Sequence, residues 1–418
     1  MDTLDVAVVG AGPAGTAAAI TLARAGIDVT VFDKATFPRD KTCGDGLTTL
    51  ALRQLEDLGL DPSVVDSWID VHECWVTGPS GHAIRLPMPG ADQGRFAAVA
   101  TRLDLDAALV DLARKEGVTV LDGTGVLDAA EDDDGVVLRV SADPADGTGA
   151  VGSGGAGREL RARWVVAADG MWSPVRRALG LAEPGYRGDW HAFRQYVRDV
   201  GDRAASELHV RFEADLLPGY FWSFPLEGRR ANIGFGIQRG GKVPVGDMGP
   251  LWEELLRRPA IRDLLGPDAT PEAPHRAWPI PARVDSSVKA TRRTLFVGDA
   301  VGACDVMTGE GIGQALLTGV RAGECIRDRA ALGDAADRYA AAVEDELLAD
   351  HRMSALLVRA LQHRKGARAA IRVAGATPWT RRHFARWLFE DSPRGLPFTP
   401  SRWRRGVLSG PGAYRDAG

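Results

Sequence analysis

Cysteine is scarce in this chain, and long apolar runs are absent. No stretch of about 18 residues lacks both charges and glycine breaks, which excludes a membrane-spanning helix. No basic segment precedes the first predicted strand, so we expect no secretory signal. The cysteines form no C-x-x-C pair, which favours a reducing, cytoplasmic location, and we expect no metal site. They are Cys43, Cys74, Cys304 and Cys325.

Length and charge narrow the class of protein. With 418 residues, the chain is long enough for two domains and an extension. The net charge is −5, yet the segment from His351 to the C-terminus carries 14 basic residues against three acids. Either an anionic surface or partner, or simply a solvated helical face, explains this asymmetry. We expect no nucleic-acid partner.

The first 46 residues predict a dinucleotide-binding unit. An apolar, β-branched strand over residues 4–9 runs directly into a G-x-G-x-x-G motif at residues 10–15, and an alanine-rich helix follows. A second strand over residues 28–33 ends in Asp33, 18 residues after Gly15. The glycines allow a tight turn and close approach of a pyrophosphate to the helix N-terminus, and Asp33 can accept a hydrogen bond from a ribose hydroxyl.

Two later segments repeat the design of a buried strand that ends in glycine or aspartate, at residues 164–170 and 294–300. Because ligands bind beyond the carboxyl ends of the strands in a doubly wound sheet, these turns should converge with the opening motif on one ligand. Between them, alternating strands and clustered aromatics over residues 186–281 predict an antiparallel sheet with one helix at 251–265. The glycine-rich stretch 143–157 is expected to be a flexible surface excursion.

Over roughly residues 1–330 the chain resembles the flavoproteins that include p-hydroxybenzoate-hydroxylase-type monooxygenases, flavin halogenases and geranylgeranyl reductases. The resemblance implies bound FAD. No second G-x-G-x-x-G motif lies between a predicted strand and a predicted helix, so either NAD(P)H binds transiently or another donor reduces the flavin. The expected fold class is α/β: a Rossmann-type FAD-binding domain with an inserted antiparallel-sheet substrate domain and a C-terminal helical extension. The predicted limits are 1–185 (with 71–100 contributing to the substrate domain), 186–284, 285–332 and 333–418.

The resemblance also implies which residues contact FAD. Asp33 and the glycine motif would hold the ADP half, Arg102 the phosphate–ribityl region and Asp299 the ribityl hydroxyls. Backbone N–H groups of residues 308–312 would pass the isoalloxazine, and Asp169 belongs to a motif linked to both FAD and NAD(P)H. The predicted cofactor residues are Gly10, Gly12, Pro13, Ala14, Gly15, Asp33, Lys34, Arg39, Cys43, Gly44, Arg102, Asp169, Gly298, Asp299, Gly309, Gly311 and Ile312.

Two stretches, residues 37–47 and 218–225, resemble the geranylgeranyl reductase branch, especially its actinobacterial members that act on menaquinone side chains. In that branch the second stretch lines a cavity for a prenyl chain, and large aromatic faces suit such an apolar substrate. These aromatics are also typical of an ordinary sheet core. The branch usually has a proline where this sequence has Val306. The predicted substrate residues are Tyr220, Trp222, Phe224 and Pro225.

The favoured function is reduction of C=C bonds in an isoprenoid chain, either a geranylgeranyl lipid or a menaquinone side chain, by hydride transfer from reduced flavin. An unactivated alkene offers no oxyanion to stabilise, so hydride delivery must be coupled to protonation. Candidate proton donors are Cys43, Asp45 and Glu310. Cys43 also fits a small turn residue, and Glu310 a structural residue at a helix N-terminus.

Two alternatives remain: an aromatic hydroxylase that uses NAD(P)H and O2, and a prenyl-lipid carrier without redox chemistry. Halogenation is disfavoured because no lysine lies between Lys41 and Lys115 to deliver the oxidant that halogenases use.

The C-terminal region mixes aromatic residues with arginines. Trp379, Phe384, Trp387 and Leu388 interleave with arginines after Thr377-Pro378, a pair typical of a helix start. The pattern predicts an amphipathic helix on an anionic membrane at its cytoplasmic face, where a polyprenyl substrate would reside. Packing of the same aromatics against the rest of the protein explains the pattern equally well.

Overall fold

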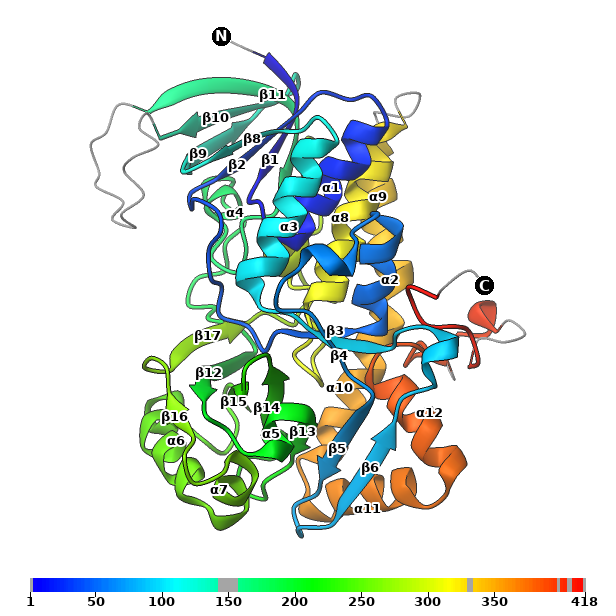
Figure 1. Ribbon diagram of the computed structural model, residues 1–418. Coiled ribbons are helices and arrows are strands. Elements are labelled where there is room, and N and C mark those ends of the chain that lie inside the picture. The colour runs from blue at the N-terminus through cyan, green and yellow to red at the C-terminus, as the bar shows by residue number, and fades with distance from the viewer. Residues whose placement is uncertain (1–2, 142–156, 329–333, 397–398, 404–407, 416–418) are drawn as a thin grey trace.

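The computed structural model describes residues 3–141, 157–328, 334–396, 399–403 and 408–415 (Figure 1). All but the last residue of the predicted excursion at 143–157 lies outside these ranges.

A seven-stranded sheet carries the opening motif, in the order β8-β2-β1-β11-β10-β9 with β18 paired to β11. All of its pairs are parallel except those of β10 with β9 and with β11. Parallel strands covered on both faces read as continuous apolar runs, and β1 has this composition. The strands are β1 (Thr3–Val9), β2 (Val29–Asp33), β8 (Thr119–Asp122), β9 (Val126–Glu131), β10 (Val136–Val140), β11 (Arg158–Ala167) and β18 (Thr294–Phe296).

Helices pack against this sheet and against one another. Helix α1 packs tightly against α8, where a Cβ at Gly319 would lie 2.1 Å from the carbonyl oxygen of Ala14. This approach brings the N-terminal ends of both helices to the same edge of the sheet (Figure 1). The helices of this region are α1 (Pro13–Arg24), α2 (Thr49–Asp57), α3 (Arg102–Lys115), α4 (Pro174–Ala178), α8 (Ile312–Arg327) and α9 (Ala335–Val343).

A second sheet of eight strands has the order β16-β12-β15-β14-β13-β5-β6, with β17 paired to β12. All pairs are antiparallel except β13 with β5, where the β5–β6 hairpin from an earlier part of the chain joins the sheet. The strands are β5 (Glu73–Thr77), β6 (Ala83–Pro87), β12 (Trp190–Arg198), β13 (Leu208–Arg211), β14 (Tyr220–Leu226), β15 (Arg230–Gln238), β16 (Thr270–Pro271) and β17 (Arg276–Ile280).

The helix expected at residues 251–265 is instead two helices, α6 (Met248–Arg257) and α7 (Pro259–Leu265). Pro259 has no N–H to continue the first helix and occupies the first turn of the second. Both helices cover the second sheet through a cluster that includes Trp252 and Phe235. The short α5 (Asp202–Ser206) lies between β12 and β13 in the sequence.

A small three-stranded sheet links the two larger ones. It contains β3 (Gly46–Thr48), β7 (Ala97–Val99) and β4 (Ile69–Asp70). The strand β3 runs directly into α2, which begins at Thr49.

The C-terminal region is helical, with α10 (Ala349–Leu361), α11 (Arg364–Gly375) and α12 (Pro378–Leu388). Ile371 of α11 and Ala385 of α12 are buried in one apolar cluster with Ile84 and Leu86 of β6. The extension therefore packs beside the β5–β6 hairpin (Figure 1). Within the described ranges, none of the helices has the length and apolar character needed to cross a bilayer. The arrangement confirms the predicted α/β class with a helical C-terminal extension.

Candidate active site

The glycine motif forms a tight turn that only glycine can make. Gly10 has φ 102°, and a Cβ there would lie 2.3 Å from the carbonyl oxygen of Ala168. A Cβ at Gly15 would lie 1.8 Å from the carbonyl oxygen of Gly10. Pro13 and Ala14 follow in the buried first turn of α1. The turn thus presents free N–H groups of the helix N-terminus, as phosphate binding requires.

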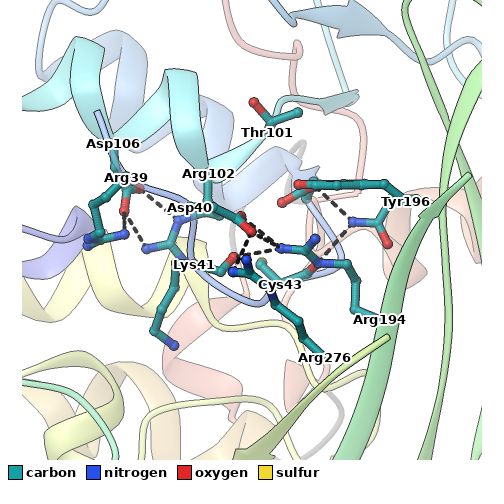
Figure 2. A network of polar contacts seen from close by, with 12 residues as sticks. Arg39, Asp40, Lys41, Cys43, Thr101, Arg102, Asp106, Arg194, Tyr196 and Arg276 are labelled. Carbon is teal, nitrogen blue, oxygen red and sulfur yellow. Dashed lines mark hydrogen bonds and ion pairs between the residues drawn. The ribbon is translucent and has the colours of Figure 1, made fainter. Parts of the chain in front are cut away.

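Two arginines face this helix N-terminus. A Cβ placed on Gly12 would lie 3.8 Å from Nη2 of both Arg39 and Arg102. Both guanidiniums donate to the buried carboxylate of Asp106, Arg39 at 2.8 Å and Arg102 at 2.7 and 2.8 Å (Figure 2). One carboxylate therefore holds two cations in place and leaves net positive charge beside Gly12. This cradle fits a pyrophosphate.

Asp33 lies at the carboxyl end of β2, as predicted, but its carboxylate is engaged by backbone. Oδ2 accepts a hydrogen bond from the Ala11 N–H, and Oδ1 accepts one from the Ala35 N–H, each at 2.8 Å. The side chain thus fixes the glycine turn, and its role toward a ribose stays a prediction. The neighbouring Lys34 is exposed.

The other two strand ends lie beside the first, as the sequence predicts. Ala167 of β11 is in register with Val9 of β1 and with Phe296 of β18. Asp169 accepts from the Val175 N–H at 3.0 Å, and its Oδ1 has no partner among the described residues. Burial raises the pKa of Asp169 to about 6.

The third strand end brings Asp299 toward the N-terminus of α8. Its Oδ1 accepts a hydrogen bond from Sγ of Cys304 at 3.3 Å, and a Cβ on Gly311 would lie 3.9 Å from the same oxygen. Gly298 has φ 58°, and a Cβ there would lie 3.1 Å from Cβ of Ala14, so this turn packs directly on the start of α1.

Asp45 is the most buried charged group of the loop that follows the glycine unit, with 0% of its surface exposed. Its backbone has φ 62°, a left-handed conformation uncommon for a residue other than glycine. Oδ2 accepts from the Tyr196 hydroxyl at 2.7 Å and from Nδ2 of Asn232 at 2.8 Å. Nδ2 of Asn232 also donates to the Cys43 carbonyl at 2.9 Å. Asp45 Oδ1 is buried without a partner among the described residues.

Burial changes the acidity of both candidate donors in this loop. It raises the pKa of Asp45 to about 6, although the hydrogen bonds from Tyr196 and Asn232 and the charge of Arg194 act in the opposite direction. Burial also raises the pKa of the Cys43 thiol, an effect that Arg102 opposes. Both groups are therefore poised to carry a proton more readily than they would in water.

The loop is held on the second sheet by a polar network that the sequence did not reveal. Arg194 donates to Asp40 at 2.7 Å and stacks over the Tyr196 ring at 4.0 Å, and Arg276 donates to Asp40 at 2.9 Å (Figure 2). Lys41 lies over the Trp278 ring at 3.7 Å. Arg194 and Tyr196 belong to β12. The sequence did not predict this strand, because its buried arginine and glutamine interrupt the apolar pattern of a strand.

Three of the predicted substrate residues share one face of β14: Tyr220, Trp222 and Phe224. A Cβ on Gly44 would lie 3.6 Å from the Phe224 ring and 3.8 Å from that of Trp222. The aromatic face therefore borders the loop that carries Asp45. Pro225 is out of phase with these side chains, and strand alternation places it on the opposite face.

The residues expected beside the isoalloxazine form a turn before α8. Gly309 has φ 70°, and Oε1 of Glu310 accepts from the N–H groups of Gly311 at 3.2 Å and Ile312 at 3.0 Å. Those N–H groups are thus engaged by Glu310, and their contact with a flavin stays a prediction. Burial, and then the nearby charge of Glu390, raises the pKa of Glu310 to about 8.

Comparisons with known proteins agree with this geometry. A family model described as FAD binding domain matches residues 3–321. The menaquinone reductase of Mycobacterium tuberculosis is 35% identical over 362 residues, which cover 81% of each protein. Digeranylgeranylglycerophospholipid reductase 2 of Methanopyrus kandleri is 32% identical over 325 residues, or 77% of this chain and 76% of that protein.

A solved structure shares the fold. The geranylgeranyl bacteriochlorophyll reductase-like protein of Thermoplasma acidophilum superposes with a TM-score of 0.76 at 20% identity, covering 96% of this chain and 99% of that one. The glycine turn, its two arginines and the Asp169 oxygen, which has no partner in the described part of the chain, fit a bound FAD. The chain belongs to the geranylgeranyl reductase family of FAD-dependent oxidoreductases.

Proposed function

We propose that this protein saturates C=C bonds of an isoprenoid chain, with a menaquinone side chain as the first candidate substrate. The observation that carries the proposal is the aromatic face of β14, formed by Tyr220, Trp222 and Phe224, beside the loop that carries Asp45. Such a face buries an apolar chain while making few polar demands on it. The names of the relatives from Mycobacterium tuberculosis and Methanopyrus kandleri support the same class of substrate.

Bound FAD, when reduced, would supply hydride to one alkene carbon. The protein must then hold a proton for the other carbon in a site that excludes water. We propose Asp45 for this task because its carboxyl group is fully buried and one of its oxygens has no partner among the described residues. Tyr196 and Asn232 fix the other oxygen and so orient the group.

Cys43 and Glu310 are weaker candidates for the proton donor. Burial raises the pKa of the Cys43 thiol despite the opposing charge of Arg102, so the thiol keeps its proton, but Cys43 is only partly buried whereas Asp45 is fully buried. Glu310 directs Oε1 into its own helix N-terminus through two backbone hydrogen bonds, a structural arrangement. The three candidates are best compared by measuring alkene reduction by the variants Cys43→Ser, Glu310→Gln and Asp45→Asn in one assay.

We propose NAD(P)H as the electron donor that reduces the flavin, binding transiently because the sequence has no second G-x-G-x-x-G motif between a predicted strand and a predicted helix. Flavin bleaching under anaerobic conditions with NADH, NADPH or neither would identify the donor. No bleaching by either nucleotide would point to a protein donor instead.

We also propose that α11 and α12 contact an anionic membrane. Val373 and Trp379 are 67% and 60% exposed, and Arg372 and Arg382 are exposed on the same two helices. Phe384 and Leu388 instead pack into the cluster that contains β6, so only part of the aromatic set is available to lipid.

Product analysis tests the proposed reaction. The purified protein with FAD, a chemical reductant and menaquinone should yield quinone with a hydrogenated side chain, measured by mass spectrometry. A hydroxylated product from a phenolic compound, formed with NAD(P)H and O2, would favour the aromatic hydroxylase instead.

A further inference from the structure

Residues 389–394 follow α12 in the C-terminal extension. They contact the junction of β3 with α2 and the first turn of α8. The Phe389 carbonyl accepts from the Thr49 N–H at 2.9 Å. Glu390 accepts from the Thr48 hydroxyl at 2.9 Å and from Nε2 of Gln314 at 2.7 Å. Thr48 follows the loop that carries Asp45, and Gln314 lies in the first turn of α8.

The backbone of Glu390 also marks this segment as constrained. Its φ is 58°, a left-handed conformation that is uncommon for glutamate and persists where surrounding contacts determine it. The hydrogen bonds from Thr48 and Gln314 hold Glu390 in this conformation. They anchor the 389–394 segment to the strand β3 and to helix α8.

Arg394 joins the same segment to the turn before α8. Its side chain is 3% exposed, and Nη1 lies 2.5 Å from Oδ2 of Asp305 and 3.5 Å from the Glu390 carboxylate. The Ser354 hydroxyl donates to the same Asp305 oxygen at 2.7 Å. One guanidinium from the extension therefore bridges two buried carboxylates from different parts of the chain.

Asp305 passes this restraint to the turn itself. Its Oδ1 accepts from the N–H groups of Met307 at 3.0 Å and Thr308 at 2.8 Å, and from the Thr308 hydroxyl at 2.8 Å. The Thr308 carbonyl in turn accepts from the Tyr220 hydroxyl. The turn that leads to Gly309 and α8 is thus held from the extension on one side and from the second sheet on the other.

Charge gives Arg394 a role beyond packing. Asp305, Glu310 and Glu390 are all close enough to influence one another's ionisation, and burial opposes the charge on each. The charge of Arg394 favours ionised Asp305 and contributes to a lowered pKa of that carboxyl despite burial. Without it, the turn would contain a buried carboxylate lacking its cation.

We infer that Arg394 is a positioning residue of the flavin site, which acts through Asp305 to fix residues 305–309 and the N-terminus of α8 where the isoalloxazine would lie. The inference rests on the proposed cofactor residues of that turn. It assigns the basic C-terminal extension a structural part in cofactor binding, in addition to any contact with lipid.

The test compares two buried ion pairs of the same segment. Arg394→Met alone leaves Asp305 buried without its cation and so risks misfolding. The double variant Asp305→Asn/Arg394→Met removes this ion pair, while an asparagine carbonyl can still accept from the turn. Glu390, whose pKa burial already raises, can then stay neutral by holding a proton. The matched control is Asp391→Asn/Arg386→Met. Arg386 and Asp391 are equally buried, but they contact Arg53 and Gly410 and not the turn before α8.

The readouts are the FAD dissociation constant, from flavin fluorescence during titration of the apoprotein, and the flavin midpoint potential. We expect the Arg394 double variant to weaken FAD binding about tenfold or more and to change the potential, because a displaced turn no longer matches the ring. The control should stay within about twofold of the wild type. Arg394→Lys keeps the positive charge and should lose less FAD affinity than the Arg394 double variant. It should still bind FAD more weakly than the wild type, since a single ammonium cannot bridge both carboxylates as the guanidinium does.

The outcomes separate this inference from the proposed cofactor site. Wild-type protein that fails to bind FAD would overturn the cofactor site itself. Wild-type protein that binds FAD, with both double variants affected equally or neither affected, would overturn the positioning role of Arg394 and leave the cofactor site standing.

Discussion

At the residue scale, Asp45 concentrates the chemistry of the site. It is a buried acid in a left-handed backbone conformation, and among the residues that the structure describes it is hydrogen-bonded through one oxygen only. Its partners Tyr196 and Asn232 are 151 and 187 residues away in sequence. The sequence predicted Asp45 as a candidate from its loop, but contacts over such separations arise only when the second sheet folds against that loop.

The raised pKa of Asp45 predicts how stability changes with pH. Folded protein keeps the proton up to about pH 6, whereas the unfolded chain releases it near 3.8. The free energy of unfolding therefore falls as pH rises through this window and stays lower above it. Asp45→Asn removes this loss and keeps the hydrogen bonds, so above pH 7 it should be about 3 kcal/mol more stable than wild type, with little difference near pH 4.

Urea unfolding at both pH values measures this effect, and reductase activity should fall in the same variant. Asp199→Asn is the control, because Asp199 has a similar φ of 57° but is exposed. A stability difference for Asp45→Asn that does not depend on pH would contradict the raised pKa.

The glycine turn gives a second prediction at this scale. Gly15→Ala should abolish FAD binding or folding, because the added Cβ would lie 1.8 Å from the Gly10 carbonyl oxygen. Gly249→Ala, in the first turn of α6 where a Cβ would have open space apart from its chain neighbours, should bind FAD normally. Flavin content of the purified proteins and thermal unfolding are the measurements. Full flavin content in Gly15→Ala would contradict the packing described here.

At the scale of single elements, the pattern of each strand or helix decided what could be predicted. The apolar run of β1 and its glycine turn were predictable because backbone geometry there needs particular residues. The strand β12 was not, because its buried Arg194 and Gln195 break the apolar pattern. The split between α6 and α7 follows from Pro259. The prediction of a single helix relied on the amphipathic spacing of the segment and gave this proline too little weight.

The two faces of β14 should respond differently to substitution. Phe224 lies on the aromatic face beside Gly46, whereas Phe221 packs on the opposite side with Trp252. Phe224→Ala should raise KM for a long isoprenoid quinone about tenfold, and less for a short-chain analogue, because the long chain loses more contact. Phe221→Leu should lower stability without a change in KM. Steady-state kinetics with both substrates decides; equal effects on the two would argue against an aromatic lining for the chain.

The exposed face of α11 and α12 should bind lipid through charge. Arg372→Glu/Arg382→Glu should weaken sedimentation with vesicles containing anionic lipid, since each basic residue near such a surface contributes about 1 kcal/mol. Arg257→Glu/Arg262→Glu, at exposed positions of α6 and α7 beside the other end of the second sheet, is the charge-matched control. Undiminished sedimentation of the double variant would show that these helices serve packing alone.

At the scale of the whole molecule, the site forms where the nucleotide sheet, the second sheet and the C-terminal extension meet (Figure 1). The glycine turn and its arginines come from the first, the aromatic face from the second, and Arg394 from the third. The motifs in the sequence predicted the cofactor and the order of the parts. They could not predict the contribution of the extension, because a basic tail looks the same whether its arginines face solvent or bridge buried carboxylates.

The most direct test of isoprenoid-chain reduction by this protein follows the oxidation of its reduced flavin. The holoenzyme is reduced under anaerobic conditions and mixed in a stopped-flow instrument with menaquinone, with a geranylgeranyl lipid, or with a phenol, while flavin absorbance is recorded. Isoprenoid reduction predicts flavin reoxidation by an isoprenoid substrate without O2, accompanied by a saturated bond in the product. Because the quinone ring can itself accept electrons, the saturated bond, measured by mass spectrometry, is the decisive readout. Reoxidation by O2 alone, with every isoprenoid chain recovered unchanged, would contradict the account.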